Sequence, residues 1–291
     1  MVVYGHGLLG GQSEVGGSQV GRNAAVNDMV FCSTDWIGMA TDDIGNVAAA
    51  LIDMSNFPTM ADRMQQGILN TLFLGRLMIH SEGLGSDAAF HSEEGEPLPD
   101  TSEAYYYGNS QGGIMGVAAT AVATDWTQAV LGVPGMNYST LLDRSIDYAQ
   151  YEVVFTDAYP DRVDQLVMYG LMQMLWDRSE GNGYAHHLTD DPLPGTPEHQ
   201  VLLHVAFGDH QVAQVTAEVM ARTAGVPLHA PALEEGRHPD EAPFFGLEQV
   251  DGYPFEGSAL VYWDTGTLAP PAGNVTPHES SAYLDECGDV D

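Results

Sequence analysis

The stretch "YYYGNSQGGIMG", Tyr105–Gly116, places Ser110 between Gly108 and Gly112. The three aromatic residues before it indicate a β-strand, and the small apolar residues after it indicate a helix. A sharp strand-to-helix turn needs glycine at these two positions, because side chains there would collide with the adjoining strand and helix. Such a turn strains the serine and aims the N-terminus of the next helix at it. We therefore expect an exposed Ser110; the alternative is an ordinary turn serine in a βα loop.

The rest of the chain alternates between strand-like and helix-like runs. Strands are predicted at residues 2–4, 29–38, 103–109 and 127–135, within 199–212, and at 257–266; helices are predicted at about 60–79, 110–123 and 212–225. This alternation predicts an α/β fold, a mostly parallel sheet with helices on both faces. Residues 138–198 interrupt it with helical runs rich in Met, Tyr and Leu. We interpret them as an inserted helical cap on a core formed by residues 1–137 and 199–291.

A second glycine-rich loop follows the first predicted strand, in "YGHGLLGG", residues 4–11. A strand that ends in His-Gly and turns through glycines exposes backbone N–H groups at the carboxyl edge of the sheet. The N–H groups of Leu8 and Gln111 are therefore candidate donors to a developing oxyanion. His6 lies at the tight turn and precedes Ser110, so we expect it to brace the loop rather than act as a base.

These two motifs carry a resemblance to a known family. With His6-Gly7-Leu8 and Gly10 as the oxyanion loop and Gly108–Gly112 as the nucleophile elbow, the chain resembles the α/β-hydrolase superfamily, and within it bacterial esterases and lipases. The resemblance implies a serine esterase that forms an acyl-enzyme on Ser110, with a small-molecule or lipid ester as substrate and no metal or organic cofactor. Amide or peptide hydrolysis on the same scaffold, or a non-catalytic member, remain alternatives.

In that family the acid and then the histidine follow the serine along the chain. Asp209 comes directly after a predicted strand, where the family places its acid; the alternative is that it caps a helix. His278 is the histidine that follows the last predicted strand, and is our first candidate for the base. His238 and His229 follow Asp209 but precede that strand. A further alternative is a base beyond Asp291, in a longer chain.

The amino-acid composition of the chain limits the classes of molecule that it can bind. The chain has 291 residues, 44% of them hydrophobic, with 8 basic and 41 acidic residues and a net charge of −33; all eight basic residues are arginine. Such a charge argues against nucleic acid and anionic membranes as partners. It suits a protein that stays soluble at high salt, as halophilic proteins do, or reflects the compositional bias of its source. No transmembrane stretch or signal peptide is visible, and the sequence favours neither secretion nor the cytoplasm.

Overall fold

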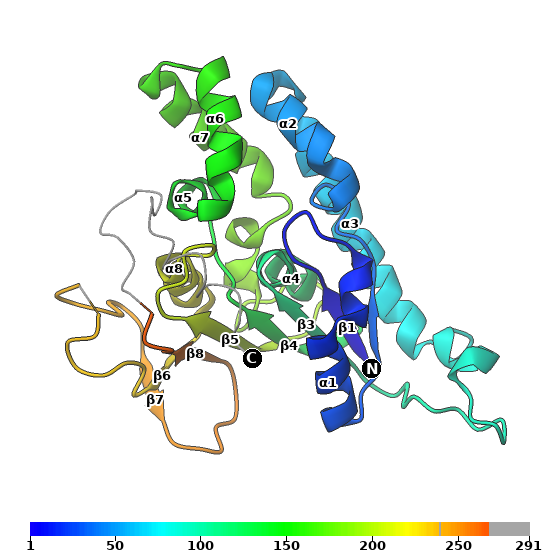
Figure 1. The fold of residues 1–291 in the computed structure, drawn as a ribbon. Helices are drawn as coiled ribbons and strands as arrows, with labels where there is room; N and C mark the ends of the chain where they lie inside the picture. The colour runs from blue at the N-terminus through cyan, green and yellow to red at the C-terminus, as the bar shows by residue number, and fades with distance from the viewer. Residues whose placement is uncertain (239, 268–291) are drawn as a thin grey trace.

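The computed structural model describes residues 1–238 and 240–267 (Figure 1). Eight strands form one sheet in the order β2-β1-β3-β4-β5-β8-β6-β7, and every pair of neighbours is parallel. They are β1 (Val2–Gly5), β2 (Phe31–Ser33), β3 (Ala104–Asn109), β4 (Trp126–Gly132), β5 (Gln200–Ala206), β6 (Leu228–Ala230), β7 (Gln249–Asp251) and β8 (Ala259–Trp263). The predicted α/β fold with a parallel sheet is confirmed. Six strands were expected, and the two additional ones, β6 and β7, have three residues each.

Helices cover the two faces of the sheet unequally. The core helices are α1 (Ser18–Asn27), α2 (Ile44–Ile52), α3 (Phe57–Ile79), α4 (Gln111–Ala121) and α8 (Gln214–Ala224). Successive residues of a strand point to opposite faces, so Tyr106 and Tyr107 of β3 mark the two sides. Every residue of α4 is buried, and its small side chains let it lie close against the Tyr106 face. Helix α1 borders the Tyr107 face instead. Helices α1 and α2 were not anticipated from the sequence.

The chain between β4 and β5 is helical and stands above the carboxyl edge of the sheet (Figure 1). It contains α5 (Tyr138–Leu141), α6 (Ala149–Ala158) and α7 (Arg162–Trp176), and α6 packs against α2. Trp176 joins this segment to the core, because its ring packs edge-on against Phe57 at a centroid distance of 4.8 Å. Because Ser110 follows β3 at the same edge, the helical segment lies over the serine.

The parallel register fixes which loops meet. In the pairing of β1 with β3, Gly5 lies beside Gly108, so the loop that starts at His6 and the turn at Ser110 leave neighbouring strands together.

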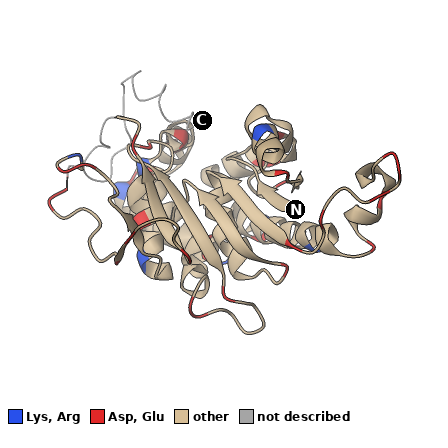
Figure 2. Cartoon of the chain, turned by 90° about the horizontal axis from the view of Figure 1, so that it is seen from below, with Lys and Arg blue, Asp and Glu red and all other residues tan. Residues whose placement is uncertain are grey.

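Acidic residues are spread over the loops of the molecule, with few basic residues among them (Figure 2). Within residues 1–238 and 240–267, no helix has both the length and the apolar character needed to cross a membrane.

Candidate active site

Ser110 sits in a strained turn between β3 and α4. Its backbone has φ 56° and ψ −122°, a region that residues with side chains rarely adopt. A Cβ at Gly108 would lie 2.5 Å from the carbonyl oxygen of Gly112, and a Cβ at Gly112 would lie 2.1 Å from that of Gly5. The predicted sharp turn with obligatory glycines is therefore confirmed. Holding one residue in such a conformation costs about 1–3 kcal/mol, which the packed strands and helix must supply.

His6 braces the neighbouring loop, as expected. The side chain is fully buried, its Nε2 accepts the N–H of Trp36 at 2.8 Å, and its Nδ1 lies 2.8 Å from the carbonyl oxygen of Gly7. Since Nε2 accepts, the ring proton is on Nδ1, which donates to Gly7. Both nitrogens are thus used to hold the loop, and neither is available to Ser110.

Further hydrogen bonds fix the loop around Leu8. The N–H of Gly7 donates to the carboxylate of Glu14 at 2.9 Å, and the N–H of Leu9 donates to the carbonyl of Met39 at 3.0 Å. Between them, the N–H of Leu8 has no acceptor among the described residues. The N–H of Gln111 has none there either, because Gln111 is the first residue of α4. Two donors are therefore left beside Ser110.

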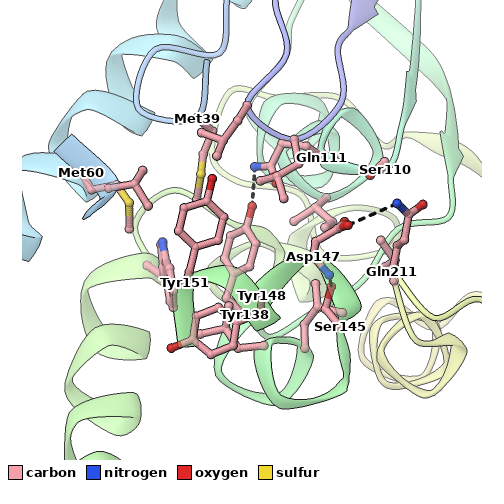
Figure 3. Close-up of a pocket in the computed structure, with 18 of the residues that line it drawn as sticks. Met39, Met60, Ser110, Gln111, Tyr138, Ser145, Asp147, Tyr148, Tyr151 and Gln211 are labelled. Carbon is pink, nitrogen blue, oxygen red and sulfur yellow. Dashed lines mark hydrogen bonds between the residues drawn. The ribbon is translucent and has the colours of Figure 1, made fainter. Parts of the chain in front are cut away.

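An apolar cavity opens beside Ser110 under the helical segment. Its volume is about 90 Å³, and Leu8, Ser110 and Gln111 are among the residues that line it. Figure 3 shows Ser110 and Met60 on opposite sides of the labelled residues. The other lining residues are Leu9, Met39, Val47, Leu51, Phe57, Met60, Ile114, Tyr138, Leu141, Leu142, Ser145, Asp147, Tyr148, Tyr151, Trp176, Gln211 and Val212. Of the large side chains of α7, Trp176 lines the cavity, while Met174 is 69% exposed on the outer surface.

A second, polar cavity meets Ser110 from the Tyr107 face of the sheet. It has a volume of about 410 Å³ and is lined by side chains from the strand ends and from α1. Its polar lining includes Asn23, Tyr107, Asn109, Ser110, His204, Asp209, Gln211 and Trp263. No group of three His, Cys, Asp or Glu side chains in the described ranges is placed to hold a metal ion.

Asp209 lies at the carboxyl end of β5 and lines the polar cavity together with Ser110. Only 6% of the residue is exposed, and its Oδ1 accepts the N–H groups of Gln211 at 2.7 Å and Val212 at 2.9 Å. Burial raises the pKa of the Asp209 carboxyl to about 6, against the lowering effect of those two N–H donors; the nearby carboxylate of Asp147 raises it further. Asp209 therefore closes the turn before α8 and also presents a carboxylate to the cavity.

Of the predicted histidines, the two that lie in residues 1–238 and 240–267, His238 and His229, do not line a cavity with Ser110. His278 lies outside the described residues. The ring of His238 lies between Phe207 and Phe244, each with its centroid 5.7 Å away, and His238 is not among the described residues that line either cavity. His229 belongs to β6, where its ring stacks on Tyr253 at 4.2 Å. Of the predicted site, Ser110, Gln111 and Leu8 share the apolar cavity, and Ser110 and Asp209 share the polar one.

His204 is a site residue that the sequence did not single out. It lines the polar cavity from β5, and its Nδ1 accepts the indole N–H of Trp263 at 2.9 Å. The two rings are stacked with an interplanar angle of 6°. In the neutral ring the proton is then on Nε2, so that nitrogen cannot take a proton from Ser110. Burial also lowers the pKa of His204, which favours this neutral form.

A buried polar network joins the elbow to the helical segment. The side-chain amide of Gln111 donates to the hydroxyl of Tyr138, whose ring lies 4.7 Å from that of Trp176. Close by, the fully buried carboxyl of Glu180 accepts a hydrogen bond from the amide of Gln173. Burial raises the pKa of Glu180 to about 8, opposed by the Gln173 bond. Glu180 is thus a buried acid that becomes charged only near pH 8.

Glu180→Gln is expected to stabilise the protein at pH 8 and above. Because the folded-state pKa of Glu180 exceeds the usual value of 4.5, its ionisation destabilises the fold progressively as pH rises from about 4.5 to 8. Removing the acid should recover roughly 2–4 kcal/mol above pH 8 and leave stability near pH 4 unchanged. Urea unfolding across this pH range measures the difference, with the exposed Glu82→Gln as control. Parallel stability curves for wild type and Glu180→Gln would contradict the assignment.

Comparison with known proteins identifies the fold. No protein-family profile matches the sequence, and none of the curated proteins is similar to it. Among solved structures, acetyl xylan esterase 1 from Thermoanaerobacterium sp. matches at a TM-score of 0.51 and 15% identity, covering 94% of this chain and 70% of that one. Acetyl xylan esterase from Paenibacillus sp. R4 matches at 0.53 and 13%, covering 92% and 69%. An acylaminoacyl peptidase from Pyrococcus horikoshii matches at 0.43 and 13%, covering 91% and 33%. The matches to the two esterases, together with the parallel sheet, show that the chain has the α/β-hydrolase fold.

Proposed function

We propose that this protein is a serine hydrolase that cleaves carboxylic esters. The Oγ of Ser110 attacks the ester carbonyl while a histidine takes its proton, and the N–H groups of Leu8 and Gln111 hold the oxyanion. Collapse of the tetrahedral intermediate releases the alcohol, which receives that proton, and leaves an acyl-enzyme. Water then hydrolyses the acyl-enzyme by the same steps and restores Ser110.

One observation carries this proposal. Ser110 is held at φ 56° on a turn that opens into two cavities, beside two backbone N–H groups without an acceptor in the described ranges. Strain of this kind persists where the surroundings impose it, and it clusters at active sites. The fold supports the proposal further, because the elbow serine lies at the sheet edge where such folds bind ligands.

We assign the base to His278 and its orientation to Asp209. His278 gives the chain order serine, acid, histidine, and the buried carboxylate of Asp209 faces the cavity that Ser110 shares. The alternatives are His238 and a histidine beyond Asp291. The aromatic enclosure of His238, away from the lining of either cavity, counts against the first of these. We further propose that residues 138–198 form a cap on a core of residues 1–137 and 199–291, and limit the size of the substrate.

A fluorophosphonate probe tests the proposal directly. The Oγ of Ser110 is expected to displace fluoride and form an O–P bond, with its proton passing to the base, so one adduct should appear on the peptide that contains Ser110. Ser110→Ala should remain unlabelled, and His278→Ala should be labelled much more slowly. Folded protein that resists the probe at both low and high salt would favour a non-catalytic role.

Esters must also be separated from amides. We expect Ser110-dependent release of p-nitrophenol from p-nitrophenyl butyrate and little release of p-nitroaniline from the matching anilide. Faster turnover of the anilide would support the alternative of amide or peptide hydrolysis on the same scaffold.

A further inference from the structure

Two cavities of different character meet at Ser110. The cavity under the helical segment is almost wholly apolar, whereas the one on the Tyr107 face has a mixed polar and apolar lining and is larger, at about 410 Å³ against about 90 Å³. We propose that the acyl group of the substrate occupies the apolar cavity and the alcohol occupies the polar one. This inference rests on the proposed function and names its substrate class: esters of short apolar acids with polar alcohols that carry no anionic group.

The position of Asp209 indicates which part of the ester occupies which cavity. In an acyl transfer, the histidine that takes the proton of Ser110 must pass it to the leaving oxygen. Asp209, which orients that histidine in the proposed reaction, lines the polar cavity and is not among the lining residues of the apolar cavity. The leaving alcohol must therefore lie on the polar side of Ser110, which leaves the apolar cavity for the acyl group.

The apolar cavity limits the length of the acyl chain. Its far end is formed by α2 and α3, where Met60 lies at the opposite side of the labelled residues from Ser110 (Figure 3). An apolar cavity of roughly 150 Å³ holds the six carbons of a benzene molecule, so about 90 Å³ suits an acyl chain of roughly three to four carbons. The polar side chains of Gln111 and Tyr138 bond to each other, so they do not require a polar acyl group.

Carboxylates near Ser110 select against anionic substrates. Asp147 lies at the wall of the apolar cavity, where its Oδ1 accepts the amide of Gln211 at 3.2 Å (Figure 3). Asp209 faces the polar cavity. An anionic group on either part of the ester would meet one of these carboxylates, so substrates without an anionic group are favoured. On the polar side, the amides of Asn109 and Gln211 offer hydrogen bonds to the hydroxyls of an alcohol.

Ethyl butanoate and butyl acetate test the direction, because they have the same atoms and differ only in which side carries the longer chain. We expect kcat/KM for ethyl butanoate to be at least about 5-fold higher, since the two additional acyl methylenes are buried in the apolar cavity only in that ester. Equal or reversed rates, abolished in both cases by Ser110→Ala, would overturn this inference and leave the proposed function intact. Absence of Ser110-dependent hydrolysis of any ester would instead remove the proposed function.

Variants at Met60 test the length limit, with p-nitrophenyl esters from acetate to decanoate as probes. Wild type should prefer butyrate, Met60→Trp should shift the preference to acetate, and Met60→Ala should shift it to longer chains. Leu69→Trp on the exposed side of the same helix is the control and should leave the profile unchanged. If Met60→Trp fails to fold, Met60→Ala decides alone, and an unshifted profile overturns the assignment of the acyl cavity.

Discussion

Ser110→Ala is expected to lower kcat for p-nitrophenyl butyrate by a factor on the order of 10⁵, because without Oγ no acyl-enzyme can form. The residual rate should reflect binding and the oxyanion donors alone. Initial rates should be measured at low and at high salt, since salt screens the repulsion within a chain of net charge −33. The loss is expected at both salt concentrations.

Two further variants separate loss of the nucleophile from loss of the fold. Ser258→Ala removes a serine at the start of β8, where Oγ accepts the N–H of Val201, and should retain activity. Ser110→Gly should be inactive yet more stable than Ser110→Ala by about 1 kcal/mol, because glycine adopts the positive φ at Ser110 without strain. A folded Ser110→Ala that keeps more than about a tenth of the wild-type kcat would rule out Ser110 as the nucleophile.

Local patterns made most of the fold predictable. Long buried strands and the amphipathic α3 carry strong periodicity, so their order and the parallel sheet could be derived from sequence. Helix α1 was missed because "SQVGRNAAVN" is largely polar and contains a glycine, which weakens the helical pattern. Strands β6 and β7 were missed because three residues are too few to show a period, and their pairing depends on contacts distant in the chain.

The same distinction applies to the candidate site: features encoded in a short stretch could be predicted, and contacts between distant elements could not. The strained turn at Ser110 is encoded within five consecutive residues, so its glycines were sufficient to predict it. The contact of His204 with Trp263 joins β5 to β8, and that of Gln111 with Tyr138 joins the elbow to α5; neither leaves a local signal. The two cavities arise from several elements at once, and the difference in their polarity could be recognised only in the assembled structure.

Asp209→Asn is expected to lower kcat by a factor on the order of 10³–10⁴, because an amide cannot stabilise the imidazolium of the base or hold its tautomer. The substitution is close to isosteric, and the Asn Oδ1 can still accept from Gln211 and Val212. If Asp209 only closes the turn, Asp209→Asn should therefore keep the wild-type kcat. In wild type, activity should fall below about pH 6, where the carboxyl of Asp209, with its pKa raised to about 6, takes up a proton.

The Asp209→Asn substitution should raise the stability of the protein, although it lowers kcat. Because the folded-state pKa of Asp209 is raised by burial, its charge destabilises the fold as pH rises from about 4 to about 6 and remains a cost above that range. Asp209→Asn should therefore be more stable than wild type by roughly 2 kcal/mol at pH 7. Asp87→Asn is the matched control, since Asp87 makes the same kind of turn with Ala89 on the surface; it should alter neither activity nor stability. An Asp209→Asn variant that is both active and less stable would show that Asp209 only closes its turn, since a buried carboxylate kept for catalysis costs stability.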